Sequence, residues 1–463
     1  MGLHRGLQRT GILSLPAKAG DAGGRKGKAV TVFGATENRA ANETGRVWIS
    51  RLIFWLVIAA GAALSVRVVL RAKFSGADSW SPMTQALDFL HRFPDQRIYE
   101  TLFFSRHVKF QYPLSSLLTL DFGRLLGVSQ IWQYNLANAF VLILTGVLFA
   151  LFVRKLFGDV SYRGIRVPVA AAAYIVALRF YPDNLAFEIG QMQLALGLLF
   201  LAACYAKLNN RPGLAGGLVG LAAMTKPQFL PLALLAIFRR DWRFTISLLA
   251  VAIVLTALSV LLYGWYNHLD YLKVLSFLSR RGEYQHLNQS IGGLLDRWLY
   301  HGPSLDRDPL GAIPQSAFPP YIPAVYFTVL ATSLVFLVLP FVVTVKGKDA
   351  TSELIGFCMA ATLFTMASPI AWVHHFNVLL PGYAVAIKAA FDRWQGGRLY
   401  FSLCLIGVSA VLVGYPIVPA SAVTDPARNI LQSHVLFGAC ILVVVFLQEA
   451  VVVPRLAKRR LES

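Results

Sequence analysis

Apolar stretches recur along this 463-residue chain, and short basic clusters separate alternate ones. A helix needs about 20 predominantly apolar residues to cross the hydrocarbon core of a bilayer. We count about twelve apolar stretches, and five of them meet or approach that length: 52–70, 131–153, 244–266, 321–345 and 434–453. Hydrophobic residues make up 56% of the chain and charged residues 14%, which excludes one large soluble core. The pattern predicts an all-α polytopic membrane protein with about 12 membrane helices.

The net charge of +20 is distributed between these stretches and does not form one patch. Lys and Arg lie in short connectors: Arg154, Lys155, Arg163 and Arg166; Lys207 and Arg211; Arg239, Arg240 and Arg243; Lys346 and Lys348; Lys388, Arg393 and Arg398. The positive-inside rule predicts that these connectors are cytoplasmic. The charge is therefore a topology signal, and no nucleic-acid partner is predicted.

Basic tails at both ends of the chain follow the same rule. Residues 1–51 are rich in Gly, Ala, Lys and Thr, which predicts a disordered cytoplasmic tail without a secretory signal. Residues 454–463 form a second basic tail. Both termini are therefore predicted to face the cytoplasm, with residues 52–453 as the domain in the bacterial cytoplasmic membrane.

The four cysteines carry no signal for metal binding. Cys204, Cys358, Cys404 and Cys440 all lie inside apolar stretches, without the close spacing of metal ligands. Their position predicts small hydrophobes without a disulfide. No metal site is predicted from them.

A short hairpin is predicted between two basic connectors. Residues 213–224 and 227–238 are each about a dozen residues, too short to cross a bilayer singly. Their junction is Thr225-Lys226-Pro227, and a proline cannot continue a helix because it lacks the N–H. The tip is expected at membrane depth or just beyond.

Two long polar segments, 71–130 and 267–320, have a different character from the cytoplasmic connectors. They carry Trp, Tyr, His, Asn and Gln, with acids and bases roughly balanced. Topology places both on the outer face, with 112–128 as an interfacial helix inside the first segment. Any active site is therefore expected in these outer-face loops.

Asp78 follows the first apolar stretch within a few residues. A carboxylate at the membrane boundary can reach both a lipid headgroup and a water-borne acceptor, and as a general base it can take a proton from an attacking hydroxyl. A solvated loop acid is the alternative interpretation, and position alone leaves both open.

Four cations lie where a lipid phosphate would be. Arg67, Arg71 and Lys73 stand at the outer end of the first stretch, and they either extend to the interface or bind a phosphate. Lys226 is a stronger indication, because an intramembrane Lys is costly and suggests function. The alternative for Lys226 is to cap helix carbonyls.

Histidines and amides complete the candidate site. His374 and His375 follow Ser368-Pro369, and adjacent helical residues project to different sides, which argues against a two-His metal site. One of them would hydrogen-bond a phosphate or share a proton with Asp78; two interface residues are the alternative. Amides and an acid at outer ends, which would hold sugar hydroxyls, are Glu188, Gln191, Gln193, Asn288 and Gln289.

Taken in chain order, several short motifs resemble those of glycosyltransferase family 87, in the GT-C superfamily of polyprenyl-phosphate-sugar-dependent transferases. They are Gly76-Ala-Asp78, Phe110-Gln-Tyr112-Pro113-Leu114, Gly190-Gln191, Met224-Thr-Lys226-Pro227-Gln228, Leu287-Asn288-Gln289-Ser290 with Arg297, and Ser368-Pro369-Ile-Ala-Trp372-Val-His374-His375. A second proline that is usual after Tyr-Pro is replaced by Leu114, which leaves the detail of that loop open.

The resemblance implies a GT-C-like helix bundle that transfers a hexose, with mannose favoured, from a polyprenyl-phosphate donor to a glycan or glycolipid acceptor. It makes Asp78 the base. Lys226, with the arginines, would hold the donor phosphate, and His374 or His375 the phosphate or acceptor. Tyr112 joins the amides as a sugar or acceptor contact. No cofactor is implied; a divalent metal is not indicated, because no Asp-x-Asp occurs near Asp78.

Two rival functions remain open from the sequence. A transporter or flippase of lipid-linked sugars also uses broken helices and intramembrane charges, but it would show inverted halves with two broken segments. An outer-face polysaccharide ligase or polymerase would carry an Arg-rich outer loop, for which Arg280 and Arg281 are a thin match.

Overall fold

The computed structural model describes residues 55–158, 166–283, 285–299, 318–343, 349–417 and 430–461. The chain divides at Leu52, and every feature below belongs to the unit that begins at Ile53. The predicted tail 1–51, the connector residues Arg163, Lys346 and Lys348, and residues 300–317 of the second polar segment lie outside the described residues. The basic side chains after Val453 do as well.

The described residues form helices joined by turns. A single antiparallel bridge, between Asn288 and Trp372, is the strand-like pairing found among them. In chain order the α-helices are Trp55–Phe74, α2 Trp80–Arg92, α3 Leu117–Leu125, α4 Ile131–Leu156, α5 Arg166–Arg179, α6 Tyr181–Glu188, α7 Gln193–Leu208, α8 Pro212–Thr225, α9 Pro231–Phe238, α10 Trp242–Tyr263, α11 Trp265–Arg281, α12 Ile291–Leu299, α13 Pro323–Val342, α14 Ala350–Met366, α15 Leu379–Arg393, α16 Gly397–Gly414 and α17 His434–Leu461. Shorter elements are the π-helix η2 Tyr99–Ser105 and the 3₁₀ helices η3 Leu114–Ser116, η4 Pro227–Phe229, η6 Val373–Val378 and η9 Leu431–Ser433.

Within the described residues, 6 helices are long and apolar enough to cross a membrane. They are Trp55–Phe74, Ile131–Leu156, Trp242–Tyr263, Pro323–Val342, Gly397–Gly414 and Leu431–Ala450, and shorter apolar helices accompany them. Their outward faces carry large apolar side chains such as Leu261 on α10 and Phe327 on α13, which suits lipid as the solvent. The chain is a multi-pass membrane protein; the count of about 12 membrane helices stays a prediction.

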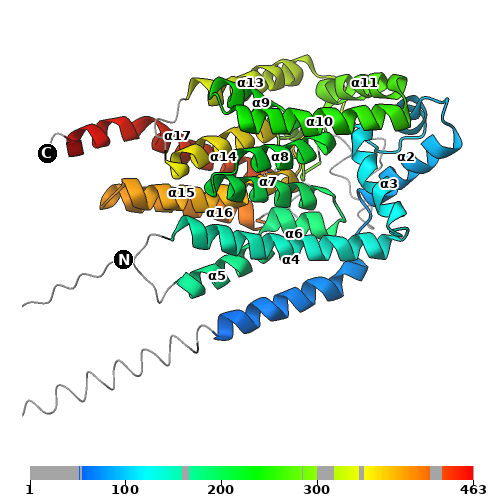
Figure 1. Ribbon diagram of the computed structural model, residues 1–463. Helices are drawn as coiled ribbons and strands as arrows, with labels where there is room; N and C mark the ends of the chain where they lie inside the picture. The colour runs from blue at the N-terminus through cyan, green and yellow to red at the C-terminus, as the bar shows by residue number, and fades with distance from the viewer. Residues whose placement is uncertain are drawn as a thin grey trace, which may run out of the picture. The chain divides into compact units, whose positions relative to one another are not determined.

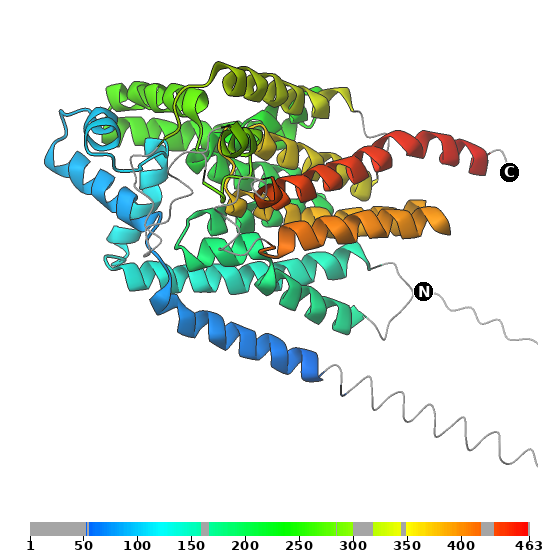
Figure 2. The same cartoon turned by 180° about the vertical axis from the view of Figure 1, so that it is seen from behind.

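The long helices lie side by side, and their ends separate into two groups (Figures 1 and 2). The end of α4, the start of α10, the end of α15, the start of α16 and the end of α17 gather at one end of the bundle. Helices α2 and α3 lie at the opposite end. We call the first the basic end, because Lys207, Arg239, Arg243 and Arg393 lie in its turns. Alternation of connectors between two ends agrees with the predicted topology.

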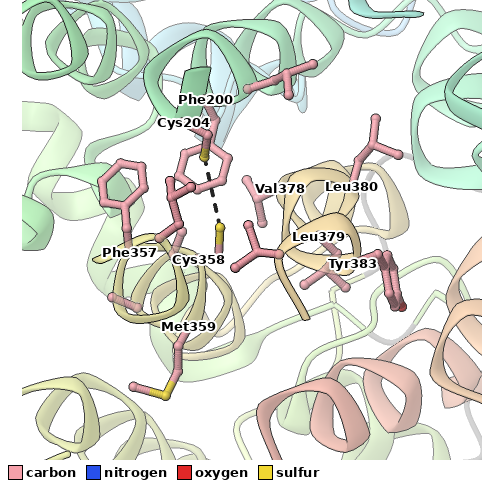
Figure 3. Packing of buried hydrophobic residues seen from close by; sticks show 14 of the residues in the cluster. Phe200, Cys204, Phe357, Cys358, Met359, Val378, Leu379, Leu380 and Tyr383 are labelled. Carbon is pink, nitrogen blue, oxygen red and sulfur yellow. Dashed lines mark hydrogen bonds between the residues drawn. The ribbon is translucent and has the colours of Figure 1, made fainter. Parts of the chain in front are cut away.

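Helices α14 and α15 form the centre of the main core. Nearly every residue of α14 is buried, and the cluster around it draws side chains from α7, α8, α10 and α17. Figure 3 shows Cys204 facing Cys358 with their Sγ atoms 4.0 Å apart, beside the stacked rings of Phe200 and Phe357. Both cysteines are free and buried, whereas Cys440 is half-buried and Cys404 is exposed on α16.

Helix α8 packs against α10 through glycines. A Cβ on Gly216 would lie 2.1 Å from the carbonyl oxygen of Phe244, and one on Gly220 would lie 2.8 Å from that of Leu248. Small residues four apart allow two membrane helices to approach closely. This contact fixes the axis of α8, and therefore the position of Lys226 directly after its last residue.

The break predicted at Thr225-Lys226-Pro227 is confirmed. Helix α8 ends at Thr225, Lys226 has extended backbone angles, and η4 begins at Pro227 before α9 returns toward Arg239. The hydroxyl of Ser115 donates to the carbonyl of Met224, which satisfies one of the free carbonyls at the end of α8.

Two details of the helix boundaries differ from a simple interpretation of the apolar pattern. A separate short helix, α6, lies between α5 and α7, because Phe180 is extended and Pro182 lies in a new first turn. The predicted interfacial helix 112–128 is shorter, because Pro113 is extended and a 3₁₀ turn precedes α3.

Candidate active site

A cavity of about 820 Å³ opens at the end of the bundle where α2 and α3 lie. All six of the motif segments noted in the sequence contribute to its wall. The contributing residues lie between 76 and 78, at 111 and 112, at 191, between 225 and 228, at 287, and between 368 and 375. Side chains that line it include Asp78, Gln191, Lys226, His374 and His375. Its volume suits a small-molecule or sugar substrate.

Two glycines bring Asp78 beside Gln191. The N–H of Gly76 donates to the carbonyl of Glu188 at 2.8 Å, and the N–H of Asp78 donates to that of Ile189 at 3.0 Å. Gly190 has φ of +71°, and a Cβ there would lie 2.1 Å from the carbonyl oxygen of Gly76. Only glycine meets both conditions at low cost, which explains why the segment 75–79 can dock on 188–191.

Gln191 holds the carboxylate of Asp78 in a fixed hydrogen-bond arrangement. Its Nε2 donates to Asp78 Oδ2, while its Oε1 accepts from Ser79 Oγ at 2.7 Å and from the Tyr112 hydroxyl at 2.9 Å. The two accepted bonds decide which end of the amide faces Asp78. The orientation of the carboxylate is therefore set by three side chains from separate segments.

Asp78 is accessible to water inside the cavity, yet protein encloses it on most sides. This desolvation raises the pKa of its carboxyl above the ordinary value, and the hydrogen bond from Gln191 and the charges of Lys109 and Lys226 oppose the rise. A carboxylate with a raised pKa is a stronger proton acceptor than an ordinary one.

Lys226 faces the cavity from the end of α8, and its Nζ contacts Nε2 of His375. Because an ammonium only donates, this nitrogen of His375 is the acceptor. His374 lies between Trp372, whose ring is stacked at 6.4 Å, and His375, whose ring is edge-on at 4.8 Å. Lys226, His374 and His375 thus form one polar wall of the cavity that also contains Asp78.

The sequence model of glycosyltransferase family 87 matches residues 110–369. This match covers more than half of the chain and includes four of the six motif segments outright. The chain belongs to glycosyltransferase family 87. The resemblance seen in the motifs is confirmed, and the protein is a membrane glycosyltransferase. A search of curated proteins found no match.

Two amides predicted to contact sugar are occupied elsewhere in this family 87 protein. Asn288 is fully buried; its Nδ2 donates to the Glu283 carbonyl at 2.6 Å, and its Oδ1 accepts from Ala371 N at 3.0 Å. Gln289 is buried as well and donates to the carbonyls of His286 and Gln432. The prediction of a sugar contact at Asn288 and Gln289 gains no support, because both amides join loops to one another.

The loop that carries Asn288 and Gln289 nevertheless supports the site through its backbone. The N–H of Gln289 donates to the Ala371 carbonyl at 2.7 Å, and the N–H of Val373 donates to the Leu287 carbonyl at 2.8 Å. These bonds attach the loop 285–290 to the segment that carries His374 and His375. Asn288 and Gln289 therefore support the histidine wall from behind.

The other predicted contacts divide into two groups. Glu188 and Tyr112 line the cavity, and the carboxylate of Glu188 pairs with Arg71 at 3.2 Å. Gln193 is buried outside the lining and donates to Asn377 Oδ1 at 3.2 Å. The cations Arg67, Arg71 and Lys73 are exposed on the first helix, and none of the three is among the described residues that line the cavity.

Three residues of the wall region were missed in the sequence. Lys109 and Gln111 line the cavity, and both bind the carboxylate of Glu283, at 3.2 Å and 2.8 Å. The signal for Lys109 and Gln111 was their place around the Phe110–Leu114 motif. Glu283 gave none, since its partners are 174 and 172 positions away.

Among the described residues, no three His, Cys, Asp or Glu side chains converge on one point where a metal ion would bind. The cavity lining instead combines two carboxylates, those of Asp78 and Glu188, with two lysines, two histidines and amides. Such a set can accept a proton at one point and balance an anion at another.

Proposed function

We propose that this protein transfers a hexose, with mannose favoured, from a polyprenyl-phosphate donor to a hydroxyl of a glycan or glycolipid on the outer face of the cytoplasmic membrane. The proposal refines the glycosyltransferase activity of the family. One observation carries it: Asp78, a carboxylate with a raised pKa, shares a single cavity with the cation Lys226.

In the proposed reaction Asp78 takes the proton of the acceptor hydroxyl as the hydroxyl oxygen attacks the anomeric carbon. The bond from that carbon to the phosphate oxygen breaks, and its electron pair leaves with the phosphate. A single displacement of this kind needs one carboxylate and no covalent intermediate. Gln191 keeps the Asp78 carboxylate oriented toward the cavity, which lowers the entropic cost of reaching a reactive geometry.

Lys226 is the proposed partner of the donor phosphate. A phosphate leaves already charged, so that it needs a nearby cation more than a general acid. Lys226 is restricted at the end of α8 by Pro227 and by His375, and an ammonium in that position is aimed before the substrate arrives. Arg71 and Lys73, exposed at the end of the first helix, are proposed as secondary attractions for the phosphate at the membrane surface.

The position of the cavity supports an outer-face reaction. It opens at the end of the bundle opposite the basic end, and basic turns are expected on the cytoplasmic side. The cytoplasm is where nucleotide sugars are made, so a site on the other side favours a lipid-linked donor.

The test uses the full-length protein purified into nanodiscs. Polyprenyl-phosphate mannose, polyprenyl-phosphate glucose and the matching nucleotide sugars are each supplied with a panel of glycolipid acceptors, and products are identified by mass spectrometry. We expect a glycosidic product from one polyprenyl-phosphate sugar and none from a nucleotide sugar, with Asp78→Asn as the inactive control. Turnover with a nucleotide sugar alone would contradict the proposal. In a parallel assay with closed proteoliposomes, donor movement across the bilayer without product would contradict it as well and would favour the flippase.

A further inference from the structure

A second lysine lies on the wall of the cavity, and a buried carboxylate fixes it. Lys109 Nζ lies 3.2 Å from Glu283 Oε2, and Gln111 Nε2 donates to the other oxygen at 2.8 Å. The Glu283 side chain is 2% exposed, whereas that of Lys109 is 24% exposed and reaches the cavity. Glu283 therefore stands behind the wall and Lys109 in it.

The ion pair with Glu283 leaves Lys109 with further N–H donors. An ammonium has three N–H donors, and the carboxylate takes one of them. The Phe318 ring, 5.4 Å away, supports the cation through its face. The result is an ammonium held in place on two sides, with donors left for the cavity.

The reaction itself moves a negative charge across this cavity. Before transfer Asp78 is an anion, and the donor, a phosphodiester, carries one negative charge. Afterwards Asp78 has gained the acceptor's proton and is neutral, while the leaving polyprenyl monophosphate carries a second charge at a pH above about 6. The charge of Lys109 acts on the Asp78 carboxylate. When Asp78 becomes neutral, Lys109 loses this negative neighbour, and the leaving phosphate gains its second negative charge in the same step.

We infer, on the basis of the proposed function, that Lys109 binds the phosphate group as it leaves. Its ammonium, held in place by Glu283, balances the second negative charge of the phosphate. Lys226 instead meets the phosphate in both the donor and the product. A preoriented cation that acts on charge developing in the reaction accelerates the chemical step and not merely the binding of substrate.

The experiment separates a dianion from a monoanion with two probes. Farnesyl phosphate is a monoester, and its methyl ester, methyl farnesyl phosphate, has the same chain and only one charge. Affinities of both are measured by isothermal titration at pH 8 and pH 5.5, with the full-length protein in detergent micelles. The variants are Lys109→Gln, the pair Lys109→Gln with Glu283→Gln, the conservative Lys109→Arg, and Lys226→Gln for comparison.

The wild-type protein should bind the monoester more tightly at pH 8 than at pH 5.5, because the phosphate acquires its second charge between the two. Lys109→Gln should weaken the monoester at pH 8 by roughly tenfold, the scale of one hydrogen bond to a charged group, and leave the diester within twofold. Lys109→Arg should restore the preference. Lys226→Gln should weaken both probes.

The double variant removes both charges, so that no unpaired carboxylate is left buried and folding is preserved. A monoester affinity within twofold of wild type in that variant would reduce Lys109 to a partner of Glu283 and overturn the inference. An equal loss for the diester would also overturn it, because Lys109 would then bind the donor. A wild-type protein that binds neither probe would contradict the proposed function itself.

Discussion

Charged side chains at the basic end of the helix bundle differ from Asp78 and Lys226 in the cavity in the partners that they have. At the basic end Lys207 pairs with Asp241 at 3.0 Å, and Arg393 donates to Ser352 Oγ at 2.8 Å and to the backbone carbonyl of Glu449 at 2.7 Å. The partners are the N-cap Asp241 of α10, a residue in the first turn of α14, and the buried Glu449. At the other end, Asp78 and Lys226 face an open cavity, and their contacts are with an amide and an imidazole.

The difference separates structural charges from functional ones. A buried charge is costly unless it is paired, and the pairs at the basic end meet that requirement with groups of the protein. In the cavity, groups of the protein only partly satisfy the charges of Asp78 and Lys226. A substrate hydroxyl beside Asp78 and a donor phosphate beside Lys226 would complete their interactions. Substitutions at the two ends should therefore change different quantities.

The largest effect is expected at Asp78. Asp78→Asn is near-isosteric and faces the cavity, so that folding and donor binding should persist while turnover falls roughly 10²–10⁴-fold, the usual scale for loss of a positioned general base. Turnover in nanodiscs, donor binding by titration and the unfolding midpoint are the three measurements. Near-wild-type turnover would return Asp78 to an ordinary loop acid and shift the search for a base to Glu188, His374 or His375.

Lys226→Met should weaken donor binding and turnover together, by roughly 10- to 100-fold, because one charge-assisted hydrogen bond is lost in both states. The matched control is Lys207→Met, the same exchange at the basic end. That control should lower the unfolding midpoint and leave the KM for donor unchanged. Equal effects of both substitutions on KM would remove the distinction between the two ends.

Arg393→Met should act on stability alone. It leaves Glu449, which is fully buried, with its Oε1 bonded to Trp394 Nε1 and its second oxygen without the cation, and breaking a buried pair costs about 3–5 kcal/mol. We expect a much lower thermal midpoint in detergent but normal turnover per folded molecule. Replacing Glu449 by Met in the same chain should recover much of the loss, and a double variant no more stable than the single would contradict the pairing.

The smallest effect is expected for Lys388→Ala. Lys388 pairs with Asp392 one turn along α15, and the acid is 40% exposed. Exposed pairs at this spacing contribute about 0.3–0.5 kcal/mol. The thermal midpoint should shift by about a degree or less, and a loss as large as that of Arg393→Met would show that burial is not what distinguishes these pairs.

Local sequence signals predicted the parts of the site that depend on short segments. The break at Lys226 follows from Pro227. The pairing of Gly76-Ala-Asp78 with Gly190-Gln191 was not predicted, although both motifs carry a glycine that allows the close approach. The all-helical character of the described residues followed from the apolar stretches, because lipid demands that every backbone group be satisfied within a helix.

Long-range packing decided the rest. Gln191 and Gln289 have the same side chain and similar positions near loop ends, yet one faces the cavity and the other joins two loops. The sequence could not separate them, because the choice depends on which backbone carbonyls lie nearby after folding. The pairing of Lys109 with Glu283 was equally hidden, since it joins segments from the two long polar regions.

The central claim, that Asp78 is the base in the cavity, is tested most directly by turnover against pH. Burial raises the pKa of the Asp78 carboxyl above its ordinary value of 3.8. As the pH is lowered, the carboxylate that accepts the proton is therefore protonated before the pH reaches 3.8. At saturating donor, kcat should fall on acidification with a midpoint above 3.8, while donor binding persists and activity returns at neutral pH. A kcat that is unchanged down to about pH 4, or an Asp78→Asn variant with the same acid limb, would contradict the account.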